Sequence, residues 1–326
     1  MSDQYFTDMA RRAVTPTACP ASTPVVDWYL DKVFDVINNE PDIFFQLYDN
    51  WADLVPTYEA LIFQTAAMPQ YFGYNGEYNQ RMTKTERDVK RFWDINSADI
   101  QVVAMHGPVL LNEARVVPTY KSDIFLGLDN ATAVLWASQD RAGLLASQRF
   151  NGGNHPFFSF NAFALSAPEL GLPDKIVMGD GILEGYKAVG YDDVALPAVF
   201  AHEFGHHIQY ERGYIDEPVP GAPAANAAEQ TRYTELMADA FSAYYLTHKR
   251  GGTMNKKRVE QFLQVFFQIG DCSFESSGHH GTPAQRMRAA QYGFKIADEA
   301  QKQGHILTAA QFHAGFVTVY PSLVAP

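Results

Sequence analysis

Positive charge and long apolar runs are both scarce in this sequence of 326 residues. It has 25 Lys and Arg against 37 Asp and Glu, and the formal net charge of −12 argues against electrostatic binding to nucleic acid or anionic lipid. No run reaches the roughly 18 apolar residues of a membrane span, so we expect no transmembrane segment. Residues 1–17 contain no apolar h-region, and no signal peptide is therefore expected in this sequence.

Cysteine is nearly absent as well, since Cys19 and Cys272 are the only two. They do not form a Cys-x-x-Cys pair, which argues against a structural zinc site. Two interpretations stay open: one disulfide in an exported protein, or two unconnected thiols. We expect a secreted or periplasmic protein. The remaining composition, with 47% hydrophobic and 19% charged residues, is that of a globular chain with room for one large domain or two.

The most informative stretch is the His-Glu-x-x-His pattern of His202, Glu203 and His206. Residues four apart on a helix share a face, with Cβ atoms about 5–6 Å apart, so both imidazoles can bind one zinc ion. Glu203 lies about 100° further round, where a base can take a proton from water on the metal. The flanks predict a largely buried helix that begins near Asp192 and ends at Gly213. A helix with two ordinary histidines is the alternative, but its buried polar groups would then need other partners.

A second apolar helix, predicted over residues 229–248, carries Glu235 and Asp239 on one face. Two carboxylates on the inner side of such a helix are costly without counter-charge, which a zinc ion and its histidines would supply. Catalytic zinc commonly has three protein ligands, and His₂Glu is one such set. We therefore predict that Glu235 is the third ligand and that Asp239 orients a ligand imidazole through its other nitrogen. A solvated surface pair is the alternative.

The first part of the chain is organised differently. Residues 1–24 are polar and rich in Pro and Thr, as a mobile arm would be, and helical spacing over residues 25–67 predicts two or three short helices. A loop over 69–82 follows. We predict a boundary here, with residues 1–82 as an N-terminal arm and helical segment and residues 83–326 as the catalytic domain.

Beyond this boundary we expect a helix over 85–94 capped by Thr85, a strand over 100–106, and a largely helical stretch over 128–145. Two extended segments, 157–165 and 175–182, precede the zinc helix.

In a peptide-cleaving enzyme, an edge strand beside the metal could bind substrate by strand addition, with the Asn161 side chain holding the substrate backbone. An ordinary core strand explains the same pattern equally well.

The last motif precedes a helix. Thr282 and Gln285 form a capping-box pattern, and Pro283 occupies the first helical position. The helix is expected to continue towards Gln301. Arg286 is interpreted as a structural anchor that pairs with a buried carboxylate.

These motifs together resemble known enzymes. His202-Glu203-x-x-His206 followed by Glu235-x-x-x-Asp239 resembles the gluzincin arrangement of thermolysin and its relatives. With the segment from His280 to Arg286, the motifs are similar to the bacterial family described as "putative neutral zinc metallopeptidase". The resemblance covers roughly residues 155–295, and residues 1–100 lie outside it.

The resemblance implies a zinc-dependent endopeptidase with an α+β zincin-like domain, a small mixed sheet and a helical core, preceded by the helical N-terminal segment. Asn161 and Ala162 then belong to the substrate-binding strand. Gluzincins place a His or Tyr opposite the zinc to stabilise the oxyanion, and His280 is our choice, with His279 next. A histidine that only hydrogen-bonds within its loop is the alternative.

The expected cofactor is Zn²⁺, and the expected partner is a peptide or protein substrate. Three alternatives stay open. The chain could be a latent protease occluded by its N-terminal helices, a non-catalytic zinc-stabilised binding protein, or a zinc hydrolase of a non-protein amide.

Overall fold

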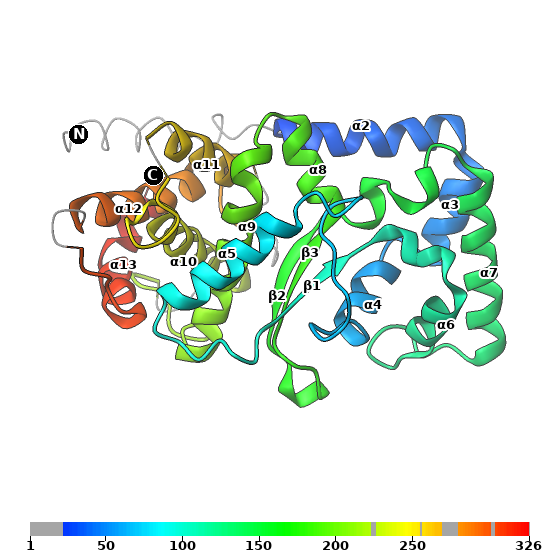
Figure 1. Ribbon diagram of the computed structural model, residues 1–326, viewed down its shortest axis with the longest axis horizontal. Coiled ribbons are helices and arrows are strands. Elements are labelled where there is room, and N and C mark those ends of the chain that lie inside the picture. Colours follow the sequence, from blue (N-terminus) through cyan, green and yellow to red (C-terminus); the bar gives the residue numbers. More distant parts are fainter. Residues whose placement is uncertain (1–21, 223–225, 255, 269–279, 301–303, 326) are drawn as a thin grey trace. The chain divides into compact units, whose positions relative to one another are not determined.

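The computed structural model describes residues 22–222, 226–254, 256–268, 280–300 and 304–325 (Figure 1). Helices dominate these ranges and accompany one three-stranded mixed sheet, which confirms the predicted α+β class. The described chain forms two compact units. The first contains residues up to 26, 81–98 and 193 onwards, and the second contains residues 27–80 and 99–192. The domain boundary between residues 82 and 83 stays a prediction.

The second unit begins with the predicted group of short helices: α2 (Pro24–Asn39), α3 (Pro41–Asp49) and α4 (Val55–Ile62). Proline at the start of α3 and α4 suits the first helical turn, which has no intrahelical use for the missing N–H. Two further helices, α6 (Glu113–Lys121) and α7 (Asn130–Ala146), complete the helical core. That core is apolar, and its buried members include Phe44, Leu47, Leu110, Tyr120, Leu144, Phe150 and Phe158.

The sheet lies in the same unit and has the order β1-β3-β2. Strand β1 (Gln101–Met105) runs parallel to β3 (Lys175–Gly179), and β2 (Ala162–Leu165) runs antiparallel to β3, so β2 is an edge strand of this sheet. The sheet packs against α4 through a small apolar cluster around Val103 and Val177.

Two predicted extended segments were too long. Residues 156–158 form a 3₁₀ turn, because Pro156 fixes one backbone angle and the His155 side chain accepts a hydrogen bond from the Phe157 N–H. The segment that begins at Lys175 leaves the sheet after Gly179, and helix α8 (Asp180–Ala188) starts there. The remaining 3₁₀ turns are η2 (Gly107–Leu111), η3 (Asn151–Gly153) and η5 (Pro168–Leu170).

The first unit is helical in its described parts. It is built from α5 (Asn79–Phe92), α9 (Asp192–Arg212), α10 (Ala227–Thr247), α11 (Lys256–Gln268), α12 (Pro283–Ala300) and α13 (Ala309–Val324). The prediction of Thr85 as a helix cap was wrong. Helix α5 begins at Asn79, and the Thr85 hydroxyl donates to the Arg81 carbonyl one turn earlier inside the helix.

Helix α10 is the centre of this unit. Gly205 of α9 lies so close to it that an added Cβ would be 3.0 Å from the Ala238 Cα, and a Cβ at Gly293 of α12 would be 2.2 Å from the Ala240 carbonyl oxygen. Because glycine has no Cβ, the backbones of α9 and α12 can approach α10 closely at these two points.

The ends of these helices lie close to their predicted positions. Helix α9 ends before Gly213, whose φ of +70° is the left-handed conformation expected of a helix stop. Helix α10 ends at Thr247, one residue before the predicted end, and His248 after it is extended. The predicted capping box of α12 is confirmed, because Thr282 and Gln285 exchange side chain to backbone hydrogen bonds of 3.0 and 3.1 Å. No helix in the described ranges is both long and apolar enough to cross a bilayer.

Candidate metal centre

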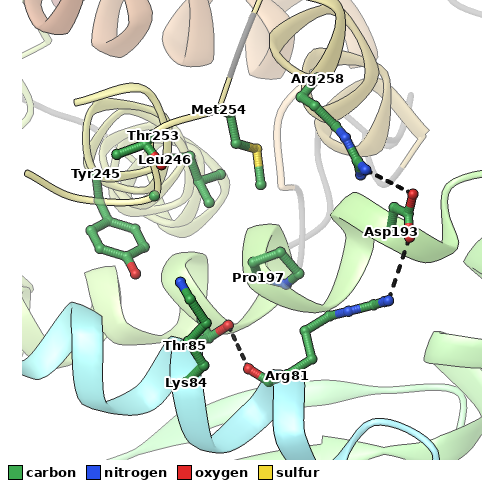
Figure 2. A pocket seen from close by; sticks show the side chains of 11 residues that line it. Arg81, Lys84, Thr85, Asp193, Pro197, Tyr245, Leu246, Thr253, Met254 and Arg258 are labelled. Atoms are coloured by element: carbon green, nitrogen blue, oxygen red, sulfur yellow. Dashed lines mark hydrogen bonds and ion pairs between the residues drawn. The ribbon is translucent and has the colours of Figure 1, made fainter. Parts of the chain in front are cut away.

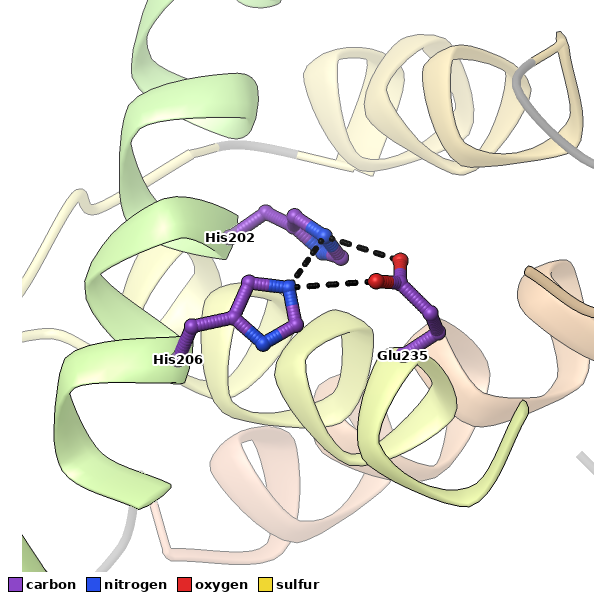
Figure 3. A group of neighbouring side chains, drawn as sticks. All are labelled: His202, His206 and Glu235. Carbon is purple, nitrogen blue, oxygen red and sulfur yellow. Dashed lines mark hydrogen bonds and ion pairs between the residues drawn. The ribbon is translucent and has the colours of Figure 1, made fainter. Parts of the chain in front are cut away.

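Three side chains of the first unit converge on one point. His202 and His206 project from α9 towards Glu235 on α10 (Figure 3). The two histidine Nε2 atoms are 3.2 Å apart. The Glu235 Oε2 atom lies 3.2 Å from His202 Nε2, and its Oε1 lies 3.3 Å from His206 Nε2. Within the described residues, this is the one group of His, Cys, Asp and Glu side chains whose ligand atoms are close enough to share a metal ion.

The spacing of these atoms fits zinc. Tetrahedral ligands about 2.0 Å from an ion lie about 3.3 Å from one another. The three separations among His202 Nε2, His206 Nε2 and the Glu235 oxygens match that edge length closely. Two imidazole nitrogens and one carboxylate are also a donor set that zinc prefers, with a fourth position left for water or substrate. The residues present therefore fit a zinc ion.

The outer nitrogen of each histidine has an acceptor. His202 Nδ1 lies 2.9 Å from Asp239 Oδ1, and His206 Nδ1 lies 3.0 Å from Gln209 Oε1. The Gln209 amide is fixed in turn by donating to the Thr234 carbonyl at 2.7 Å. When Nδ1 donates a hydrogen bond outwards, Nε2 presents its lone pair to the ion.

Arg286 of α12 contacts the two carboxylates of the site, Asp239 and Glu235. Its guanidinium donates to both Asp239 oxygens, from Nε at 2.9 Å and from Nη2 at 2.8 Å. Its Nη1 also lies 3.2 Å from Glu235 Oε2. Arg286 is 1% exposed and Asp239 is fully buried, so the charge of each needs a buried partner, which this ion pair supplies. The sequence indicated an anchoring role for Arg286, but Gln209 was missed. Its position three residues after His206, inside an apolar helix, was the available signal.

Electrostatics favour a cation between these groups. Burial alone would lower the pKa of His202, but its hydrogen bonds to Asp239 and Glu235 outweigh burial and raise that pKa to about 10. Burial would raise the pKa of Glu235, but the charges and hydrogen bonds of His206 and His202 hold it well below its usual range. Burial raises the pKa of Glu203, which is 6% exposed. A metal bound at the two Nε2 atoms would replace the proton that each imidazolium carries there, because only a neutral imidazole binds a metal.

The other predicted site residues lie elsewhere. Asn161 and Ala162 belong to the second unit, where exposed Asn161 directly precedes β2 and Ala162 is paired with Met178 of β3. Their part in substrate binding stays a prediction. His280 is exposed at the end of the chain segment that leads into α12, and its role as an oxyanion donor also stays a prediction. His279 and both cysteines lie outside the described residues.

The fold and the site thus define an α+β protein with a His₂Glu group that suits zinc. Comparison with known proteins agrees with this description. Residues 185–304, which contain α9, α10, α11 and α12, match the family model described as "Putative neutral zinc metallopeptidase". A search of curated proteins and a search of solved structures found no match.

Proposed function

We propose that this chain is a zinc-dependent endopeptidase of the gluzincin type. The observation that carries the proposal is the convergence of His202, His206 and Glu235 at tetrahedral spacing, with Glu203 next to the first ligand in the chain. The match of residues 185–304 to a zinc metallopeptidase family supports peptides as the substrate class. Asp239 of α10, which contacts His202, completes the pattern predicted from the sequence.

Different residues of the site have different roles in hydrolysis. A zinc ion held by His202, His206 and Glu235 would lower the pKa of water towards 7 and polarise the scissile carbonyl. Glu203 accepts a proton from the attacking water and passes it to the leaving amine. Burial raises the pKa of Glu203, which favours the return of the proton from Glu203 to the leaving amine. Asp239 keeps His202 in the tautomer that a metal ligand needs.

The test is digestion of a diverse peptide mixture, read by mass spectrometry. Wild type is compared with Glu203→Gln and with Glu211→Gln, a matched change at an exposed position of the same helix. All three proteins are first checked for one bound zinc per chain. We expect cleavage by wild type and by Glu211→Gln, and a loss of about 10³-fold or more in Glu203→Gln. The cleaved bonds then report the side-chain preference, and internal cleavage distinguishes an endopeptidase from an exopeptidase.

Other outcomes decide between the alternatives. Equal cleavage by all three proteins would exclude Glu203 as the base and indicate a contaminating protease. No cleavage by any zinc-loaded protein contradicts an active peptidase and favours a latent enzyme, a zinc-stabilised binding protein or a hydrolase of non-protein amides. Repeating the digestion after limited proteolysis of the zinc-loaded chain then tests latency, since deletion of residues 1–82 would remove α2, α3 and α4 from the core of the second unit. Export from the cytoplasm is also a proposal, and cell fractionation tests it.

A further inference from the structure

A second candidate site lies in the first unit, away from the metal ligands. It is a cavity of about 420 Å³, within the usual range for small-molecule pockets. Its walls come from α5, from the first turns of α9, and from the chain that joins the end of α10 to α11 (Figure 2).

The lining is rich in positive charge. Arg81, Lys84 and Arg258 face the cavity, and Asp193 is the single acidic residue among the described residues that line it. Figure 2 shows Asp193 between the two arginines, 3.4 Å from Arg81 and 2.8 Å from Arg258. Lys84 pairs with Asp88, which lies outside the lining. In a chain with a net charge of −12, three cations around one cavity indicate an anionic group as ligand.

The opposite wall is apolar and preformed. Pro197 and Met254, both half-buried, supply its apolar surface, and the fully buried Leu246 lies beneath it. The turn after α10 folds back on the helix, with the Gly252 N–H donating to the Tyr245 carbonyl at 2.8 Å and the Met254 N–H donating to the Leu246 carbonyl at 2.9 Å. Gly252 is required for this approach, because an added Cβ would lie 2.8 Å from the Leu246 backbone. The ligand therefore also has an apolar part.

The cavity offers one negative group between its two arginines. The Asp193 side chain is 58% exposed, so it stays accessible to a ligand although it contacts both arginines. An accessible carboxylate beside these cations favours a ligand that also carries an amino group.

The position of the cavity separates it from the metal centre. Asp193 precedes His202 by nine residues on α9, which corresponds to about 13 Å along the axis and a rotation of about 180°. Pro197 is rotated from His202 by about 140°. The cavity therefore lies on the side of α9 that faces away from the zinc ligands.

We propose that this cavity binds a free α-amino acid with an apolar side chain. The carboxylate of the ligand contacts the cluster of Arg81, Lys84 and Arg258, its ammonium group contacts Asp193, and its side chain packs against Pro197 and Met254. The proposal does not depend on peptidase activity, since it concerns binding alone.

The experiment is isothermal titration calorimetry on the zinc-loaded full chain, with L-leucine as the probe. Three analogues dissect the recognition: leucinamide lacks the carboxylate, N-acetyl-leucine lacks the ammonium group, and inorganic phosphate is a plain anion. We expect leucine to bind, and we expect each analogue to bind about ten-fold more weakly or worse. Arg258→Gln and Lys84→Gln should each weaken leucine binding about ten-fold. Arg91→Gln, at an exposed position of the same helix but outside the lining, is the matched control and should leave leucine binding unchanged.

Several results would overturn the proposal. Absence of leucine binding does so directly, as does leucine binding that neither cavity variant weakens. Phosphate bound as tightly as leucine would indicate a general anion site, and equal binding of leucinamide would exclude recognition of the carboxylate. The titration is repeated with Glu235→Gln at the metal centre. Binding lost there but kept in Arg258→Gln would assign leucine to the metal site and contradict the cavity.

Discussion

Replacing Arg286 by methionine tests whether the buried charges behind the metal ligands stabilise the fold. Methionine fills much of the same volume but leaves Asp239, which is fully buried, without its two guanidinium hydrogen bonds of 2.8 and 2.9 Å. Hydrogen bonds to charged groups contribute about 1.5–3 kcal/mol each, and removal of one partner from a buried ion pair costs about 3–5 kcal/mol. We therefore expect Arg286→Met to lower the free energy of unfolding by about 3–5 kcal/mol in zinc-free buffer.

The assay is equilibrium unfolding in urea, with a double-mutant cycle that adds Asp239→Asn. Asparagine removes the orphaned charge, so the double variant should lose less stability than the sum of the two single variants, by about 1–3 kcal/mol. Arg286→Lys keeps the charge but not the two-pronged contact, and it should fall between wild type and Arg286→Met. The reasoning would be refuted by a cost below about 1 kcal/mol for Arg286→Met, or by additive losses in the cycle.

Three further predictions concern packing and charge. Gly205→Ala should push α9 from α10, since the new Cβ would lie 3.0 Å from the Ala238 Cα; we expect a loss of about 1–3 kcal/mol in thermal unfolding and weaker zinc binding in a chelator competition. Lys175→Met should cost about 2–4 kcal/mol in urea unfolding, because the buried ammonium group donates to three backbone carbonyls at the end of α4. Burial raises the pKa of Asp140 from 3.8 to about 7. The folded state therefore binds this proton more tightly than the unfolded state, and the free energy of unfolding should fall by up to about 4 kcal/mol as pH rises between these two pKa values and level off above them. Asp140→Asn should remove this slope in unfolding curves measured from pH 4 to 8.

The parts of the molecule that the sequence predicted well are those set by local spacing. The helical period alone places His202 and His206 on one face of α9, and Glu235 and Asp239 on one face of α10. Gly213 marks a helix end through its backbone conformation, which is also a local property. The α+β class agreed with the family resemblance, whereas helices such as α6 and α8 had no periodicity that distinguished them from extended segments.

Local spacing failed where neighbouring segments decide the conformation. The aromatic run after Pro156 alternates as a strand does, yet its first residues turn away because the His155 side chain accepts a backbone N–H there. Thr85 has the chemistry of a helix cap, but α5 starts earlier and the hydroxyl is satisfied by a carbonyl one turn back. In both cases a polar side chain could hydrogen-bond to the backbone in two different local conformations, and the sequence pattern did not show which one forms.

The charge balance of the metal centre shows where this limit lies. A buried Asp239 requires a cationic partner, and that requirement can be read from one apolar helix. The partner is Arg286 of α12. It reaches Asp239 because α12 packs closely against α10 at Gly293, where an added Cβ would lie 2.2 Å from a carbonyl oxygen of α10. The sequence therefore predicts the kinds of groups that must meet at the site. Which residue meets which is decided by how closely the helices approach, and a small residue on the facing surface sets that distance without taking part in the chemistry.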